Sequence, residues 1–561
     1  MTKAAKNNRK SLLVLVVILI LINLAASRIF KRFDLTADNR YTLSATSLDI
    51  VNNIAEPLYI DVFLEGEFPG EFTKLQTETQ QLLEEFKAQN PNIIFQFVNP
   101  LENDDEREAI IESFLQRGLT PVNVTLADKG KQTQEIVFPW AIATYGERSV
   151  KIPLLKNSMN ESTAEKVVSS VQHLEYAFAN GFNTISNDKE KKIAVIKGNG
   201  QLHDLLMADF IRNVRENYFI GTFTLDSVAI KPNESLKYLQ KYDLAIIAKP
   251  TEAFSDEEKM VLDQFVMNGG KSLWLIDQVA IEMDSLYNEY GSTLAYPRDL
   301  NLNDMFFKYG IRINPVLVKD VMATPIALAT GETGSATQYT QYPWFYSPWI
   351  YPTAKHPIVN NIDGLKFEFA NSIDILKNDV SKTVLLQSSQ YSKPIGTPVE
   401  VALEMVQDRP DQSEFANSGA IPLAVLLEGN FKSVYENRVL PFPESSFKRS
   451  SSANKMIVVA DGDIIRNQLD KDFRPMELGF DKWTNKLYGN KEFLMNSVNY
   501  LLDDTGLINI RSKHVELPVL DQEQVYANYT RTQVITVGVP LLVLLVFGFT
   551  FTFLRSRKYG R

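Results

Sequence analysis

KIAVIKGNGQLHD, the stretch at residues 192–204, decides the fold class of this chain. Residues 193–196 form an uninterrupted apolar run that ends at a Gly-Asn-Gly turn, and this pattern is typical of a buried strand. The same pattern returns at residues 243–248 and 272–276. Strands that alternate with helices and are joined by right-handed crossovers predict an α/β domain with a parallel, doubly wound sheet.

Further elements continue this rhythm on the carboxyl side. Helices are expected at residues 203–214, after the capping box from Ser255 to Glu258, and at residues 492–502. Strands are expected at residues 218–224, 315–318, 383–386, 424–427 and 456–460. The pattern loosens between residues 309 and 454, but we interpret the later strands as members of the same Rossmann-like sheet.

Upstream of residue 183 the chain alternates strands and helices in a second run. Strands are expected at residues 58–64, 93–98, 122–126, 134–138 and 141–145, and helices at residues 72–88, 104–116 and 163–180, the last closed by Gly181. This order resembles the thioredoxin fold. Residues 67–71 read Glu-Phe-Pro-Gly-Glu where that fold carries its CxxC motif, so the resemblance implies a scaffold or binding domain without dithiol chemistry.

The carboxyl-terminal part of the chain contains a membrane span. Residues 534–554 are 21 residues without a charge, which at about 1.5 Å per residue gives about 32 Å of helix. Only Arg531 lies close before this run, whereas four basic residues follow it: Arg555, Arg557, Lys558 and Arg561. The positive-inside rule therefore places the C-terminus in the cytoplasm.

A shorter apolar run at residues 12–26 follows Lys3, Lys6, Arg9 and Lys10. Cleavage as a signal peptide is the alternative, because small residues at 25–27 resemble a cleavage site. Basic residues follow at once, and a helix with snorkelling basic ends can continue through residue 30, so we expect an uncleaved anchor. Two spans then predict a two-pass inner-membrane protein with both termini in the cytoplasm and its main body in the periplasm.

The expected domain order follows from these runs. It comprises a cytoplasmic tail (residues 1–10), transmembrane helix 1 (11–30), a thioredoxin-like domain (31–182), a linker (183–192), a Rossmann-like, amidotransferase-like domain (193–510), a juxtamembrane segment (511–533), transmembrane helix 2 (534–554) and a second cytoplasmic tail (555–561).

The body of the chain is acidic. The formal net charge is −10, and the tails before residue 11 and after residue 553 hold eight basic residues and no acid, which leaves 50 basic and 68 acidic side chains elsewhere. Such a body repels phosphate backbones, so no nucleic-acid partner is expected. The chain has no cysteine, which excludes disulfides, thiolate metal sites and cysteine nucleophiles.

Five segments carry a resemblance to a known family: residues 192–204, YDLAIIAKP (242–250), GGKSLWLID (269–277), KMIVVADGDIIRNQ (455–468) and GNKEFLMNSVNYLL (489–502). In this order, between two terminal anchors, they resemble the GldG family of gliding-motility-associated ABC-transporter auxiliary proteins over nearly the whole chain. The resemblance implies a complex with a GldF-like permease and a GldA-like ATPase. The central sheet also resembles that of glutamine amidotransferases, whose nucleophile is a cysteine that this chain lacks.

The Gly198-Asn199-Gly200 turn is a candidate ligand crevice. The third glycine of a G-x-G-x-x-G motif is replaced by His203, so a structural turn is the preferred interpretation over a nucleotide site.

Asp461 and Asp463 flank Gly462 at the predicted carboxyl end of a strand, where open α/β sheets bind their ligands. Two carboxylates there can bind a metal or a hydroxyl group, whereas turn formation and helix capping are the preferred alternative. The rival function is an envelope glycan or peptide hydrolase that uses Asp461, Asp463 and His203.

No catalytic motif is complete. Residues 270–272 match the end of a Walker A motif, but position 265, which that motif needs as glycine, is phenylalanine. The four histidines have no H-E-x-x-H spacing, and there is no G-x-S-x-G segment. We therefore expect a non-enzymatic chain without metal or cofactor, which acts as a binding or force-transmitting module and is a candidate for oligomerisation within its complex.

Two further sets of residues are candidates for binding partners. Residues 339–352 are expected to form an aromatic, proline-stiffened loop that either binds a partner or packs on its own domain, with Tyr342, Trp344, Phe345, Tyr346 and Trp349 as its contact residues. In the membrane, small or polar residues permit close helix contact with a permease, and these are Asn23, Gly538, Pro540 and Gly548.

Overall fold

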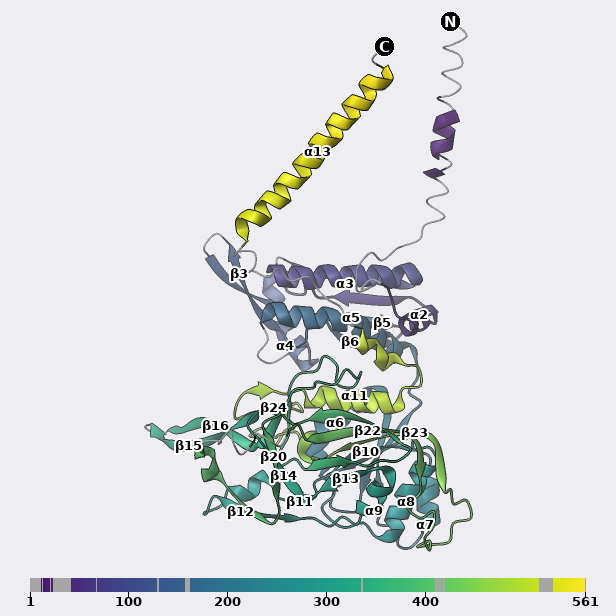
Figure 1. Ribbon diagram of the computed structural model, residues 1–561, viewed down its shortest axis with the longest axis vertical. Coiled ribbons are helices and arrows are strands. Elements are labelled where there is room, and N and C mark those ends of the chain that lie inside the picture. The colour runs from purple at the N-terminus through teal and green to yellow at the C-terminus, as the bar shows by residue number, and fades with distance from the viewer. Residues whose placement is uncertain are drawn as a thin grey trace. The chain divides into compact units, whose positions relative to one another are not determined.

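The computed structural model of the chain describes residues 12, 14–20, 22–23, 42–66, 68–128, 131–156, 162–333, 336–408, 415, 419–513 and 528–559 (Figure 1). The chain divides into two compact units, Met1–His514 and Val515–Arg561. The first unit is mixed α/β and contains an N-terminal part (residues 42–186) and a central part (residues 192–513), each with its own sheet.

The N-terminal part is a four-stranded sheet with helices packed on it. Its elements are α2 (Ala45–Asn52), β1 (Leu58–Val62), α3 (Gly70–Gln89), β2 (Ile93–Phe97), α4 (Arg107–Gln116), β3 (Val122–Asp128), β4 (Lys131–Val137), β5 (Trp140–Tyr145), β6 (Arg148–Pro153) and α5 (Thr163–Ser186). The sheet order is β2-β1-β5-β6, with β1 parallel to β2 and antiparallel to β5. The expected strands at residues 122–126 and 134–138 form a separate hairpin of β3 and β4, and β6 was not expected.

The length of α5 differs from the prediction. The helix begins after a capping box in which Ser162 Oγ accepts from the Glu165 amide and Glu165 accepts from the Ser162 amide. The expected stop at Gly181 is wrong, because the helix continues to Ser186. A Cβ atom at Gly181 would lie 2.7 Å from Ile152 Cδ1 on β6, so this glycine permits close packing of the helix against the sheet.

The central part is larger and irregular. Its helices are α6 (Ala208–Asn217), α7 (Pro232–Leu239), α8 (Asp256–Met267), α9 (Asn303–Tyr309) and α11 (Asn490–Leu502). Its short 3₁₀ turns are η2 (Asp204–Met207), η3 (Met283–Leu286), η4 (Leu403–Gln407), η5 (Asp463–Ile465) and η6 (Leu507–Ser512), and a further one, η1 (Asp104–Glu106), lies in the N-terminal part. Its strands are β7 (Lys192–Lys197), β8 (Phe219–Thr224), β9 (Leu244–Ala248), β10 (Lys271–Leu275), β11 (Val279–Ala280), β12 (Ser292–Pro297), β13 (Ile311–Asn314), β14 (Val316–Asp320), β15 (Ala323–Thr333), β16 (Ala336–Ile350), β17 (Leu365–Lys366), β18 (Ser372–Ile375), β19 (Ser381–Gln387), β20 (Ser392–Gly396), β21 (Val399–Ala402), β22 (Pro422–Lys432), β23 (Ser450–Val459), β24 (Phe480–Asp481) and β25 (Lys486–Leu487).

The main sheet has seven strands in the order β19-β22-β23-β10-β9-β7-β8. The strands from β23 to β8 are parallel neighbours, whereas β22 pairs antiparallel with both β23 and β19. The expected all-parallel sheet is therefore wrong at one edge. The chain returns from β22 to β23 without a crossover helix, and a direct return produces an antiparallel pair.

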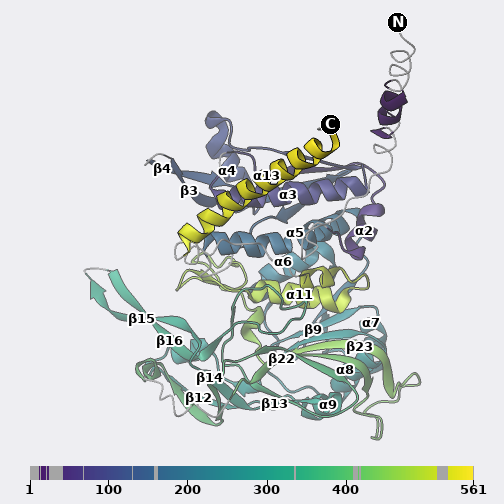
Figure 2. The ribbon, with the colours of Figure 1, turned by 45° about the horizontal axis from the view of Figure 1, so that its top comes forward.

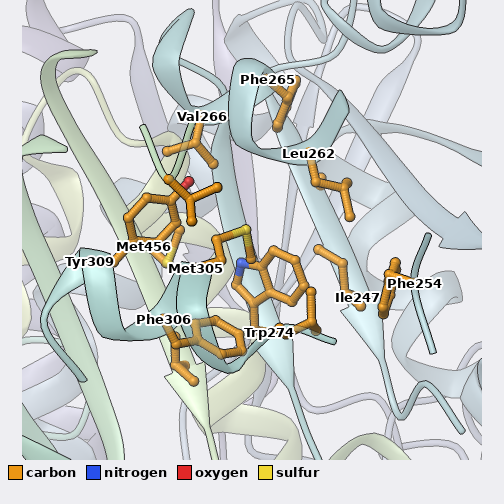
Figure 3. Packing of buried hydrophobic residues seen from close by; sticks show 14 of the residues in the cluster. Ile247, Phe254, Leu262, Phe265, Val266, Trp274, Met305, Phe306, Tyr309 and Met456 are labelled. Atoms are coloured by element: carbon orange, nitrogen blue, oxygen red, sulfur yellow. The ribbon is translucent and has the colours of Figure 1, made fainter. Parts of the chain in front are cut away.

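The sheet is buried on both faces. Side chains of β9, β10 and β23 pack on one face against α8 and α9, and on the other against α6 and α11. Figure 3 shows Trp274 of β10 packed among residues of α8 and α9. Its ring centroid lies 5.2 Å from that of Phe306 on α9. Burial on both faces explains why these strands read as continuous apolar runs in the sequence.

The segment between β10 and β19 folds outside the main sheet. The expected strand at residues 315–318 belongs to β14, which pairs with β20 and not with the main sheet, so that prediction is wrong. The expected loop at residues 339–352 is also wrong up to residue 350, because it forms most of β16. Strands β15 and β16 pair along their length and project as an arm from the central part (Figures 1 and 2).

The N-terminal and central parts meet through α5, α11 and η6. The linker between them is shorter than the expected residues 183–192, because α5 continues to Ser186. Both views show α5 between α3 and α11 (Figures 1 and 2). Glu492 of α11 accepts from Arg511 at 2.6 Å and pairs with Lys156 at 3.1 Å, and Arg511 lies 3.4 Å from His173. We call these four residues the interdomain network.

The second unit contains α13 (Tyr529–Tyr559). Among the described residues, one helix, Tyr529–Arg557, is long and apolar enough to cross a membrane, with a mean hydropathy of 2.5. Of the first predicted anchor at residues 11–30, residues 12, 14–20 and 22–23 are described and helical. The rest of that anchor lies outside the described residues.

Candidate functional site

Three parallel strands of the main sheet end side by side, and each is followed by charged residues. Lys249 comes directly after β9, Asp277 follows β10, and Asp461 and Asp463 follow β23. Because carboxyl ends of parallel strands lie at one edge of a sheet, these side chains meet there.

Lys249 is at the centre of this group. It is 3% exposed, and its backbone has a φ of 51°, a left-handed conformation that is uncommon for a residue with a side chain. Its ammonium group lies 2.8 Å from Glu282 Oε2 and 3.4 Å from Asp277 Oδ2, and it also donates to Asp463 Oδ2. We call Lys249, Asp277, Glu282, Asp461 and Asp463 the cleft network.

Gly462 permits the close approach of the turn after β23 to Lys249. A Cβ atom at this position would lie 2.6 Å from Lys249 Cγ, and the Gly462 amide donates to Asp277 Oδ1 at 2.6 Å. Asp461 is fully buried and accepts at 2.7 Å from the amides of both Glu368 and Asp463. Through these hydrogen bonds its carboxylate holds the turn after β23 in place.

The cleft network holds more negative charge than one lysine neutralises. Burial lowers the pKa of Lys249, but the carboxylates of Asp463, Asp277 and Glu282 together outweigh burial and raise this pKa. Burial, followed by repulsion from Asp277 and Asp463, raises the pKa of Asp461 well above its ordinary value. Burial is also the first cause that raises the pKa values of Asp277 and Glu282. A lysine held protonated in this way is a charge partner and not a nucleophile.

A cleft of about 430 Å³ opens above this network. Residues of β15 form part of its lining, and the segment from Asp463 to Asn490 forms much of the rest. The residues that line it are Leu206, Met283, Asp284, Tyr287, Pro325, Ile326, Ala327, Lys366, Glu368, Asp463, Arg466, Asn467, Gln468, Leu469, Gly479, Phe480, Asp481, Lys482, Trp483 and Asn490. Its volume is typical of sites for small ligands.

The structure brings only some of the predicted site residues together. Asp463 lines the cleft and Asp461 lies behind it. Gly198, Asn199, Gly200 and His203 are not among the described residues that line the cleft. Asn199 donates to Glu258 Oε2 at 2.9 Å, and His203 caps η2 by accepting from the Leu205 amide, so both have structural partners.

The predicted aromatic residues are mostly buried. Trp344, Phe345 and Tyr346 are between 2% and 6% exposed, and Trp344 and Tyr346 pack in a cluster with Phe369. Tyr342 and Trp349 are partly buried. At the outer part of the arm, Tyr339 contacts Trp483, a cleft residue, at a ring distance of 5.9 Å.

The predicted membrane contact residues lie on helices. Asn23 is in the described part of the N-terminal helix, and Gly538, Pro540 and Gly548 lie within α13. Their role in helix docking stays a prediction.

Sequence reasoning missed Lys249, Asp277 and Glu282 of the cleft network. The signal that marked Asp461 was a polar residue directly after a buried strand, and Lys249 and Asp277 follow their apolar runs in the same way. Glu282 and the cleft residues Glu368 and Trp483 carry no such signal, because they come from irregular segments folded over the edge of the sheet.

Comparisons with known proteins cover most of the chain. A family model described as "ABC-type uncharacterized transport system" matches residues 190–497, which contain every residue of the cleft network. A second model, described as a domain of unknown function, matches residues 37–144.

Two known proteins illustrate the range of similarity. An uncharacterized protein of Borreliella burgdorferi is 22% identical over 537 residues, which cover 94% of each chain. The solved N-terminal domain of mmIFT52 is 14% identical, and the match covers 56% of this chain and 99% of that one with a TM-score of 0.31.

Proposed function

The chain belongs to the auxiliary family described as "ABC-type uncharacterized transport system", and we propose on that basis that it is a non-catalytic, membrane-anchored subunit of a transporter of this type. Membership suggests an accessory role and an association with transporter components. The observation that carries the proposal is the family match over the central part, together with an apolar helix that can anchor the chain.

The finer form of the proposal is a GldG-like subunit in a gliding-motility complex with a GldF-like permease and a GldA-like ATPase. Two anchors, at residues 11–30 and 534–554, hold a periplasmic body, with both termini in the cytoplasm. The basic residues after the second span and the helical residues in the first support this topology.

The body consists, in this proposal, of a thioredoxin-like domain (residues 31–182) and a Rossmann-like domain (residues 193–510). The parallel pair β1-β2 with the hairpin β5-β6 supports the first assignment, and the five parallel strands of the main sheet support the second. The interdomain network supports joint movement of the two domains, because Lys156 of the N-terminal part pairs with Glu492 of the central part, and His173 lies 3.4 Å from Arg511.

Within the complex the cleft is the binding element of the subunit. It lies at the carboxyl edge of an open α/β sheet, where such sheets bind ligands, and a left-handed residue at its base is typical of functional sites. The protonated Lys249 favours binding over nucleophilic chemistry.

Co-purification tests the proposal. The full chain, tagged and extracted from its own membranes in mild detergent, is expected to bring down a polytopic permease and an ATPase in comparable amounts. Recovery of the chain without transporter components from membranes that contain them would contradict it.

A variant in which residues 534–554 are replaced by an unrelated apolar span of equal length separates docking from anchoring. We expect this variant to insert into the membrane but to lose the permease. Unchanged co-purification would reduce that helix to an anchor. Protease added to spheroplasts tests the topology, since a periplasmic body is degraded.

A further inference from the structure

The charged side chains that line the cleft are unevenly balanced. Four lining residues are acidic (Asp284, Glu368, Asp463 and Asp481) and three are basic (Lys366, Arg466 and Lys482). Behind the cleft, Lys249 pairs with Asp277 and Glu282 in addition to Asp463. The cleft and its base therefore hold an excess of carboxylates over cations.

Each lining cation already has a partner. Lys366 lies 3.1 Å from Glu368 and 3.2 Å from Asp481, and Arg466 lies 3.0 Å from Asp284. Lys482 donates to the Leu469 carbonyl at 2.8 Å. The lining carboxylates are paired as well: Asp284 with Arg466, Glu368 and Asp481 with Lys366, and Asp463 with Lys249. The preference for a cationic ligand over an anionic one therefore rests on the larger number of carboxylates and not on a free group.

One carboxylate oxygen in the cleft lacks a hydrogen bond. The Asp463 side chain is 7% exposed, and its Oδ1 has no hydrogen-bond partner among the described residues. Arg466 forms an ion pair with Oδ1 at 3.7 Å, which is too far for a hydrogen bond. A buried acceptor without a donor in a ligand-sized cleft indicates that the donor is supplied by something bound there.

Aromatic rings at the cleft provide a second attraction for a cation. Trp483 and Tyr287 both line the cleft and are 55% and 57% exposed. The ammonium group of Lys482 lies 5.3 Å from the centroid of the Trp483 ring, so this ring already interacts with a cation. Exposed indole and phenol rings attract organic ammonium groups through their faces.

We propose that the cleft binds a small organic cation, a molecule that carries one or two primary ammonium groups on an aliphatic chain, with Asp463 and Asp284 as its charge partners and Trp483 as its aromatic contact. This inference rests on the proposed binding role of the subunit and names its ligand class. The volume of about 430 Å³ fits a molecule of this size.

Three matched compounds test the charge requirement on the full chain in detergent. They are 1,5-diaminopentane, its neutral analogue 1,5-pentanediol and its anionic analogue glutarate, each titrated calorimetrically. We expect saturable binding of the diamine, at least tenfold weaker binding of the diol and glutarate, and a loss of diamine affinity as the salt concentration rises.

Variants locate the site. Asp463→Asn is expected to weaken diamine binding at least tenfold, and Asp284→Asn, at an exposed position that does not threaten folding, several-fold. Trp483→Ala is expected to weaken it by a similar factor. Glu234→Gln, on α7 outside the cleft, is the matched control and should leave binding unchanged.

Three results would overturn the inference. The first is no saturable binding of the diamine, and the second is binding of the diol, of glutarate or of a sugar such as glucose that is as tight as that of the diamine or tighter. The third is unchanged diamine affinity in both Asp463→Asn and Asp284→Asn. If co-purification with the transporter persists in any of these cases, the ligand class is wrong and the accessory function stands. Loss of co-purification in the wild-type chain would contradict the function itself.

Discussion

The interdomain network and the cleft network are both clusters of ions inside the protein, but their charges balance differently. In the interdomain network one acid, Glu492, lies between two cations, Lys156 and Arg511. Burial raises the pKa of Glu492, but the two cations outweigh burial and lower it to about 2. In the cleft network the carboxylates outnumber the lysine, and the pKa of Asp461 is raised well above its ordinary value.

This difference gives the two networks opposite effects on stability. A carboxyl with a lowered pKa stabilises the fold above its ordinary pKa of 4.5, and this stabilisation is lost as the pH falls towards 2. A carboxyl with a raised pKa holds its proton more tightly in the folded state, so stability falls as the pH rises above its ordinary pKa of 3.8. The interdomain network therefore stabilises the protein at neutral pH, whereas the cleft network retains repulsion that a bound cation can relieve.

The largest effect is expected from Arg511→Met. The Arg511 side chain is 2% exposed, and its removal leaves Glu492 with Lys156 alone. Breaking a buried ion pair from one side typically costs about 3–5 kcal/mol. We expect a lower thermal midpoint of the purified chain. We also expect easier proteolysis where the N-terminal part meets the central part. An unchanged midpoint would show that the interdomain network does not hold the two parts together.

The pH dependence of Glu492→Gln sharpens the comparison. At pH 7 this variant should be destabilised by roughly 2–4 kcal/mol, because two cations lose their acid. The difference from the wild type should shrink as the pH falls from 4.5 to 2, since the wild-type carboxylate is then protonated. Thermal midpoints measured across this range provide the test, and parallel curves would contradict it.

Lys249→Met is expected to have a smaller effect than Arg511→Met. It removes the ammonium group that pairs with Asp277, Glu282 and Asp463, and leaves Arg466 at 3.8 Å from Glu282 and 3.7 Å from Asp463. The expected loss is roughly 2–3 kcal/mol at pH 7. The carboxyls of Asp277 and Glu282 already have raised pKa values, so they take up protons readily and limit the loss. The destabilisation should decrease at pH 5, and a larger effect at pH 5 than at pH 7 would exclude this explanation.

The smallest effect is expected from Gly462→Ala, at about 1–2 kcal/mol. The added Cβ would meet Lys249 Cγ at 2.6 Å and displace the lysine from its carboxylates. Gly70→Ala is the matched control, because an added Cβ there has no neighbour within 4 Å and the residue is the first of helix α3. Equal midpoints for the two variants would mean that the turn moves freely away from Lys249.

The strands of the main sheet were predictable because burial on both faces requires apolar runs such as β7 and β9. Their direction was not predictable, since the antiparallel strand β22 has an equally apolar run. The aromatic segment at residues 339–352 was mistaken for a loop because it contains three prolines, two of which lie within β16. Pro343 is accommodated because it faces Pro325 across the hairpin.

The candidate site was only partly predictable. The rule that ligands bind after parallel strands found Asp461 and Asp463, and the same rule applied to β9 and β10 finds Lys249 and Asp277. Trp483 and Glu368 join the cleft through tertiary contacts between distant segments, and no local pattern records such contacts. The same limit applied to Gly181, whose role depends on Ile152 of a different element.

The central claim is that this chain acts on a transporter and has no reaction of its own. The most direct measurement is ATP hydrolysis by the purified permease and ATPase, reconstituted with and without the chain. We predict no hydrolysis by the chain alone and a several-fold change in the transporter's rate when the chain is bound. Hydrolysis by the stringently purified chain, or an identical transporter rate with and without the bound chain, would contradict the account.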